Sequence, residues 1–184
     1  MIAQQQKLDV TANNLANINN YGYKNKSVSF SNLMYYNMNN QYGQDTAMKA
    51  GTGVKVEMTN TDFTPEAYTE TDGAYDFAIG GKGFFRLVNP SSDAVTYTRN
   101  GHFSLSQQGN QFYLVNDAGN RVCDRNGNPV IVNNGTFSGE IGIYQFNITD
   151  GMQSVGDNEF APTAKNGTPF LVQDGKLIRH ALET

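Results

Sequence analysis

Apolar residues near the N-terminus recur at helical spacing. The residues Leu8, Thr11, Ala12, Leu15 and Ile18 follow the order i, i+3, i+4, i+7 and i+10. This stripe is narrow, because it holds only two Leu, one Ile and small residues, and such a stripe suits a helix that packs along another helix. The spacing therefore predicts an amphipathic helix that ends within residues 19–22, where Asn and Gly tolerate left-handed backbone.

Residues 31–50 lack a clear period. They are polar and carry several Met and Tyr residues. We predict a loop or extended connector here, which could order on contact with a partner.

From residue 51 onward, short apolar runs alternate with turn dipeptides such as Asn100-Gly101 and Asn126-Gly127. Short, regularly spaced strands are typical of a barrel-like, Greek-key or meandering β domain. The buried face of the last run is ambiguous, because both of its sides carry apolar residues. The predicted strands are residues 54–58, 75–79, 84–88, 95–98, 103–106, 112–115, 130–132 and 141–146.

The fold class is thus mainly β, with an N-terminal helical segment before a β-rich domain of short antiparallel strands. Charge supports a division near residue 50, since residues 1–50 carry four Lys and two Asp, whereas the remainder is acidic. We predict three parts: a helical segment at 1–30, a connector at 31–50 and a β-rich outer domain at 51–184.

Composition excludes several classes of protein. Charged residues make up only 16% of the 184 residues, against about 25% in an average domain, and amides replace them. The net charge of −4 argues against nucleic-acid binding. No run of about 18 apolar residues predicts a membrane span. One Cys cannot form an internal disulfide, and one Cys with two distant His residues gives no cluster of metal ligands. We therefore expect no cofactor and no metal.

Three local patterns suggest chemistry, and each has a simpler explanation. The run Gly80-Gly81-Lys82-Gly83 lacks phosphate-loop spacing and favours a tight turn. Asp124-Arg125-Asn126-Gly127 resembles the start of a calcium loop but lacks its closing Glu, so a turn is favoured. The acidic residues between 57 and 76 could hide a hydrolytic carboxylate pair, but solvated side chains are favoured. We therefore expect no catalytic residue and no enzyme activity.

The amides of the N-terminal helix leave two interpretations open. Asn13, Asn14 and Asn17 are poor helix formers that interrupt the apolar stripe. They indicate either an ordinary surface helix of low propensity or a helix whose amides hydrogen-bond across a contact between subunits.

Residues 8–24, LDVTANNLANINNYGYK, resemble a signature of bacterial flagellar axial proteins, the rod and hook components. Its core is A-N-N-[LI]-A-N-x-N-T-x-G-[FY]-K, and Asn20 replaces the usual Thr. Residues 76–85 are similar to the family's D-x-A-I-x-G-x-G-F-F, and residues 97–103 to its Y-T-R-x-G-x-F, with His102 unusual there. Residues 177–183 resemble, more weakly, the link into a C-terminal helix. The chain is most similar to distal-rod subunits.

The resemblance implies a structural rod subunit that polymerises helically into the axial drive shaft. Its partners would be copies of itself, other rod and hook axial proteins and the flagellar export apparatus. It would lie outside the cytoplasm, in the basal body within the periplasm and cell wall, after export without a cleavable signal peptide. Because the family's C-terminal helix does not follow Thr184, we expect a trimmed chain that lacks much of the polymerising core.

Two groups of residues are assigned roles in this interpretation. The subunit interface would comprise Leu8, Asn13, Asn14, Leu15, Ala16, Asn17, Ile18, Gly22, Tyr23 and Lys24. The structural turn motifs would comprise Gly80, Gly81, Gly83, Phe84, Phe85, Arg99 and Gly101.

Other functions remain open at this point. A proximal-rod or hook-type paralogue is the near alternative. From another class, an extracellular β-rich module that binds glycan or peptidoglycan could stack sugars on Tyr97, Tyr113 and Tyr144. A hydrolase is the weakest alternative.

Overall fold

The computed structural model describes residues 2–32, 35–39, 45–51 and 54–184. It divides the chain into two compact units. The first, here called the helix–hairpin unit, comprises Met1–Asn17 and Asn25–Asp62, and the second, the β unit, comprises Ile18–Lys24 and Phe63–Thr184. The described residues form one helix and many short antiparallel strands, so the predicted mainly-β class is confirmed.

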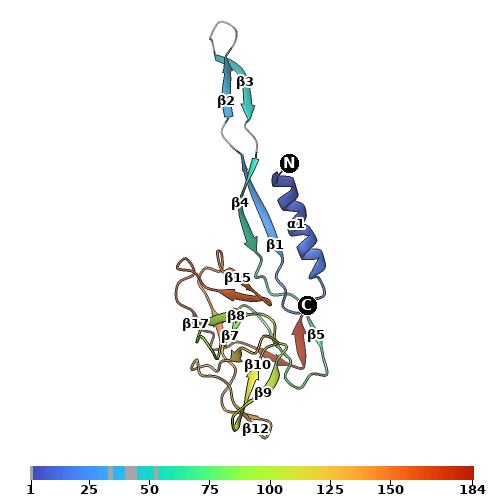
Figure 1. Cartoon of the computed structure of the whole chain (residues 1–184), viewed down its shortest axis with the longest axis vertical. Coiled ribbons are helices and arrows are strands. Elements are labelled where there is room, and N and C mark those ends of the chain that lie inside the picture. Colours follow the sequence, from blue (N-terminus) through green and yellow to red (C-terminus); the bar gives the residue numbers. More distant parts are fainter. Residues whose placement is uncertain (1, 33–34, 40–44, 52–53) are drawn as a thin grey trace. The chain divides into compact units, whose positions relative to one another are not determined.

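The helix–hairpin unit contains helix α1 and two antiparallel strand pairs (Figure 1). Strand β1 pairs with β4 from Lys26 opposite Thr61 to Asn32 opposite Val54. Strands β2 and β3 pair within residues 31–50, which the sequence predicted as a loop or extended connector, because the sequence there has no apolar period that would indicate strands. The elements are α1 (Ile2–Ala16), β1 (Lys26–Asn32), β2 (Tyr35–Asn39), β3 (Asp45–Gly51) and β4 (Val54–Thr61).

Helix α1 ends at Ala16, three residues before the predicted end within residues 19–22, and turns and a bend occupy residues 17–22. None of its residues is buried. Leu8 and Leu15 of the predicted stripe are 67% and 69% exposed. The partly buried positions, among them Val10 and Asn14, lie on another face of the helix. Leu8 and Leu15 of the predicted stripe are therefore uncovered on α1, and Ile18, the last residue of that stripe, lies in the turn beyond the helix.

The β unit is built around one large antiparallel sheet with strand order β15-β16-β8-β7-β11-β10-β9, to which β14 and β17 are joined through β7. Three further pairs, β5 with β19, β6 with β18 and β12 with β13, complete it. The first strands are β5 (Tyr68–Glu70), β6 (Phe77–Ile79), β7 (Phe84–Val88), β8 (Val95–Thr98), β9 (Ser104–Gln108), β10 (Gln111–Val115) and β11 (Arg121–Val122). The later strands are β12 (Val132–Asn133), β13 (Thr136–Phe137), β14 (Ile143–Gln145), β15 (Gln153–Gly156), β16 (Glu159–Ala161), β17 (Phe170–Leu171), β18 (Leu177–Arg179) and β19 (Ala181–Glu183).

The core of the β unit consists of two clusters of buried apolar side chains. The ambiguous run at 141–146 is explained by them, because Ile141 and Ile143 belong to the first cluster and Tyr144 and Phe146 to the second. The first cluster contains Phe77, Ile79, Phe85, Leu87, Phe103, Leu114, Val122, Val130, Val132, Ile141 and Ile143. The second contains Phe84, Tyr97, Tyr144, Phe146, Met152 and Phe160.

Candidate functional site

Arg99, a predicted turn-motif residue, is the centre of a buried ion cluster in the β unit. Its Nη1 group donates to the carbonyl oxygens of Gly81 at 2.8 Å and Gly83 at 2.7 Å. The backbone φ angles of these glycines, +156° and +137°, present both carbonyls toward the guanidinium. The Gly80–Gly83 turn thus binds an internal arginine and not a phosphate, and Phe84 and Phe85 begin strand β7.

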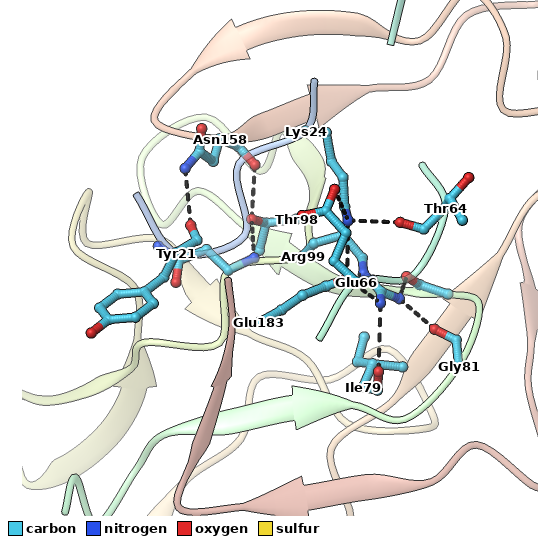
Figure 2. A network of polar contacts seen from close by, with 12 residues as sticks. Tyr21, Lys24, Thr64, Glu66, Ile79, Gly81, Thr98, Arg99, Asn158 and Glu183 are labelled. Atoms are coloured by element: carbon cyan, nitrogen blue, oxygen red, sulfur yellow. Dashed lines mark hydrogen bonds and ion pairs between the residues drawn. The ribbon is translucent and has the colours of Figure 1, made fainter. Parts of the chain in front are cut away.

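Glu183, on strand β19, is the counter-ion of Arg99 (Figure 2). Arg99 Nε donates to Glu183 Oε2 at 2.6 Å, and Nη2 donates to Oε1 at 2.9 Å, which is a bidentate pair. Both side chains are buried, with 1% and 3% of their surface exposed. The guanidinium and the carboxylate are therefore removed from water together, and the carbonyl oxygens of Gly81, Gly83 and Ile79 accept from the remaining donors.

Lys24 places a second cation on the same carboxylate. Its Nζ donates to Glu183 Oε1 and to the Thr64 carbonyl oxygen, each at 2.9 Å, and lies 3.4 Å from Glu66 Oε1. The amide of Glu66 also donates to Glu183 Oε1, at 2.8 Å. The Lys24 side chain is fully buried, so this ammonium, which the sequence assigned to a subunit interface, has its partners inside the chain.

The environment of Glu183 favours its ionised form. Burial alone would raise the pKa and is the largest single effect. The hydrogen bond and positive charge of Arg99, the amide of Glu66 and the Lys24 ammonium together outweigh it and hold the pKa of Glu183 below its ordinary value. The cluster is therefore a structural ion pair network and not a proton donor.

The segment Ile18–Lys24 is fixed to the β unit next to this cluster. The amide of Gly22 donates to the Glu183 carbonyl oxygen at 2.9 Å, and Asn158 Nδ2 donates to the Tyr21 carbonyl oxygen at 3.1 Å. Gly22 has a φ of +65°, and a Cβ there would lie 2.4 Å from the Asn100 amide nitrogen. Only glycine fits this approach, and Tyr23 beside it is half-buried.

Gly101 has an equally tight contact. A Cβ at this position would lie 1.6 Å from the carbonyl oxygen of Phe77, whose amide donates to the Gly101 carbonyl oxygen at 3.0 Å. The turn after β8 is thus packed directly onto β6, with the ring of Phe103 against that of Phe85.

The helix amides predicted at an interface have hydrogen bonds within the chain. Asn14 Nδ2 donates to the Lys26 carbonyl oxygen at 2.8 Å, and the Lys26 amide donates to Asn14 Oδ1 at 3.1 Å. This pair copies a backbone ladder and ties α1 to β1. Asn17 Nδ2 donates to the Asn13 carbonyl oxygen at 2.8 Å. Of the predicted interface residues in this segment, Leu8, Asn13, Leu15, Ala16 and Ile18 are exposed, and Asn14 and Asn17 are partly buried.

The tyrosines suggested for sugar stacking are engaged otherwise. Tyr97 and Tyr144 are core residues, and the Arg121 guanidinium covers the ring of Tyr113 at 4.3 Å. Burial raises the pKa of the Tyr97 and Tyr144 hydroxyls, as expected for core phenols. These three side chains therefore do not form a sugar-binding surface.

Glu183 is the functional residue that the sequence failed to assign. It carries no local signal, since it is one Glu in a short strand, and only the weak resemblance of residues 177–183 pointed to its segment. The motifs singled out Arg99 and Lys24, but not their shared partner. Glu183 lies 84 residues after Arg99 and 159 residues after Lys24.

The site and fold define a structural class of protein, with an internally braced β unit and a helix whose apolar stripe is uncovered. Comparison with known proteins places this class. Residues 78–156 match the family model for the flagellar hook protein FlgE/F/G D1 domain, and residues 1–24 match the model for flagella basal body rod proteins.

Individual relatives agree. The flagellar basal-body rod protein FlgG of Buchnera aphidicola subsp. Schizaphis graminum is 31% identical over 213 residues, covering 99% of this chain and 80% of the relative. FlgG of Caulobacter vibrioides is 29% identical, covering 100% and 80%. The flagellar hook protein FlgE of Salmonella typhimurium is 33% identical over 179 residues, covering 94% of this chain but 40% of the hook protein. The chain belongs to the family of flagellar rod and hook axial proteins.

Proposed function

We propose that this chain is a structural subunit of the flagellar basal-body rod, and specifically of its distal part, which assembles helically with copies of itself and with other axial proteins. The observation that carries the proposal is a set of uncovered apolar side chains, two on α1 and one in the turn that follows it. Leu8, Leu15 and Ile18 are each about two-thirds exposed. Repeated contacts between unlike surfaces that do not close generate an open helical filament.

The contact residues of the proposed interface are fewer than the sequence suggested. The exposed members of the predicted set are Leu8, Asn13, Leu15, Ala16 and Ile18, and these are the contact residues that we propose. Asn14 serves α1 docking within the chain, and Gly22 and Lys24 serve the ion cluster. Burial of the stripe against neighbouring helices would supply most of the association energy.

The other parts of the proposal rest on the family. We infer that the β unit forms the outer wall of the rod and that the subunit performs no catalysis. The flagellar export apparatus would deliver it, without a cleavable signal peptide, to the extracytoplasmic basal body. In the described part of the chain, no helix combines the length and apolarity that crossing a membrane requires.

The nearest alternative is another member of the same family. Similarity to a hook protein covers most of this chain, so a hook-type or proximal-rod role is the outcome to distinguish. The site of incorporation, seen by labelling the subunit in purified basal bodies, separates the three roles.

The test of assembly is a substitution on the stripe in the complete gene. Leu15→Ser should leave the thermal unfolding of the purified chain unchanged, because the side chain is exposed, and should abolish rod assembly and swimming. Gln6→Ser, exposed on another face of α1, is the matched control and should swim normally. Normal rods in Leu15→Ser cells would refute the interface.

A further inference from the structure

A polar groove lies in the β unit where four turns meet. Its volume is about 390 Å³, within the range of about 300–1,000 Å³ for small-molecule sites. Neither Arg99 nor Lys24, the two cations of the ion cluster, lines this groove. The lining residues are Asn19, Asn20, Tyr21, Thr98, Asn100, His102, Asn116, Asp117, Ala118, Asp157 and Asn158.

The chemistry of this lining selects the class of ligand. None of the described lining residues is Lys or Arg, and Asp117 and Asp157 are carboxylates, so the groove repels anions. Five of the residues are Asn, and each Asn side chain both donates and accepts hydrogen bonds. A sugar hydroxyl has the same double capacity, and carboxylates and imidazole accept from such hydroxyls.

Several of these amides are held in fixed positions. Asn116 Nδ2 donates to the buried carboxylate of Glu159 at 2.7 Å, and Asn116 Oδ1 accepts from the Asn120 amide at 2.8 Å. Asn100 Oδ1 accepts from the His102 amide at 3.0 Å. Walls that are already ordered lose little entropy when a ligand binds.

Tyr21 adds an apolar surface to the groove. Tyr21 is 41% exposed, and Figure 2 shows its ring pointing away from the ion cluster, while its backbone carbonyl accepts a hydrogen bond from Asn158. An aromatic ring with a fixed backbone beside convergent polar groups can stack on the apolar face of a sugar ring.

We propose that this groove binds a neutral saccharide, with the amides and Asp117 bonded to its hydroxyl or acetamido groups and Tyr21 packed on its ring. The site goes beyond the proposed assembly role, which uses α1. It also differs from the tyrosine surface considered from the sequence, because none of Tyr97, Tyr113 and Tyr144 contributes to it.

The test is a nuclear magnetic resonance titration of the 184-residue chain with di-N-acetylchitobiose, a neutral disaccharide. Saturable shifts should appear at the backbone amides of the lining residues. Asp117→Asn and Tyr21→Leu should each weaken binding about tenfold, since the first replaces a charged hydrogen-bond acceptor by a neutral one and the second removes the stacking ring. Asp93→Asn, an equal charge change in an exposed turn outside the groove, is the matched control and should bind like the parent.

Three results would overturn the proposal. The first is the absence of saturable shifts up to about 50 mM disaccharide, a concentration far above a millimolar Kd. The second is equal affinity of Asp117→Asn and Asp93→Asn for the disaccharide. The third is the appearance of the same shifts with calcium chloride alone. The third result would show a cation site instead. Because Asp117 and Tyr21 are exposed, dispersed spectra of the variants separate lost binding from lost folding.

Discussion

Glu183 neutralises two buried cations with one carboxylate. Replacing it by Gln keeps the shape but leaves Arg99 without a counter-ion in a dry site and leaves Lys24 with only the exposed carboxylate of Glu66. Removing one partner of a buried ion pair costs about 3–5 kcal/mol. We expect Glu183→Gln to lower the free energy of unfolding by about this amount, measured by urea denaturation.

The matched control for this substitution is Glu140→Gln. Glu140 also pairs with an arginine, Arg125, at 2.9 Å, but 79% of its side chain is exposed. Exposed ion pairs contribute about 0–1 kcal/mol, so this variant should unfold almost like the parent. Similar losses in the two variants would mean that burial of the Glu183 cluster has no energetic consequence.

The lowered pKa of Glu183 also predicts a dependence of stability on pH. A carboxyl group whose pKa is lower in the folded than in the unfolded chain stabilises the fold above its unfolded value of about 4.3. This contribution is lost as the pH falls through the folded-state pKa. When the pH is lowered from about 5, the urea concentration at the unfolding midpoint should therefore decrease for the parent. It should decrease less for Glu183→Gln. Parallel curves for the two proteins would contradict this assignment.

At the scale of elements, the turn at Gly22 holds the segment Ile18–Lys24 on the β unit by close backbone contact. Gly22 and Gly109 have nearly the same φ, +65° and +64°, but only Gly22 has atoms within 4 Å of an added Cβ. Both Ala variants carry the left-handed cost of about 1–2 kcal/mol. Gly22→Ala should lose about 1–3 kcal/mol more, because its Cβ meets the Asn100 backbone.

The measurement is again the free energy of unfolding of the two variants. Since φ is matched, their difference reports the contact alone. Equal destabilisation by Gly22→Ala and Gly109→Ala would show that the segment is not packed against the turn after β8.

Sequence patterns predicted the bounds of strands well where turn residues mark both ends. Strands β7 and β8 have the predicted bounds, because β-branched and aromatic residues there are closed by the turn residues Asn89-Pro90 and Asn100-Gly101. Strands such as β5 and β15 were missed, because all their residues are exposed and carry no apolar signal. Asn14 was predicted to bond outside the chain, whereas its partner Lys26 lies only 12 residues away; a helix pattern contains no information on what its polar face meets.

At the scale of the whole chain, the ion cluster was beyond sequence reasoning because its members are distant. Lys24 and Glu183 are separated by 159 residues, and no periodicity links them. The motifs identified two of the three charges through resemblance, but the third became visible only when β19 paired with β5. Pairwise contact between remote short strands is what the fold adds to the sequence.

Cys123 provides a probe of how far the ion cluster and the core of the β unit unfold together. Its side chain is fully buried at the centre of the sheet, and burial raises the pKa of the thiol to about 11. At pH 8 only about one thiol in a thousand is ionised while the side chain stays buried. Labelling by a disulfide reagent should therefore be slow and should require opening of the β unit.

Glu183→Gln should accelerate this labelling. If the cluster and the core open as one unit, a loss of about 3–5 kcal/mol raises the open fraction, and hence the labelling rate, by at least about a hundredfold. Glu140→Gln should label like the parent. An unchanged labelling rate in Glu183→Gln, together with its lowered urea midpoint, would show that the cluster opens separately from the sheet around Cys123. The ion cluster would then stabilise only the segment Ile18–Lys24.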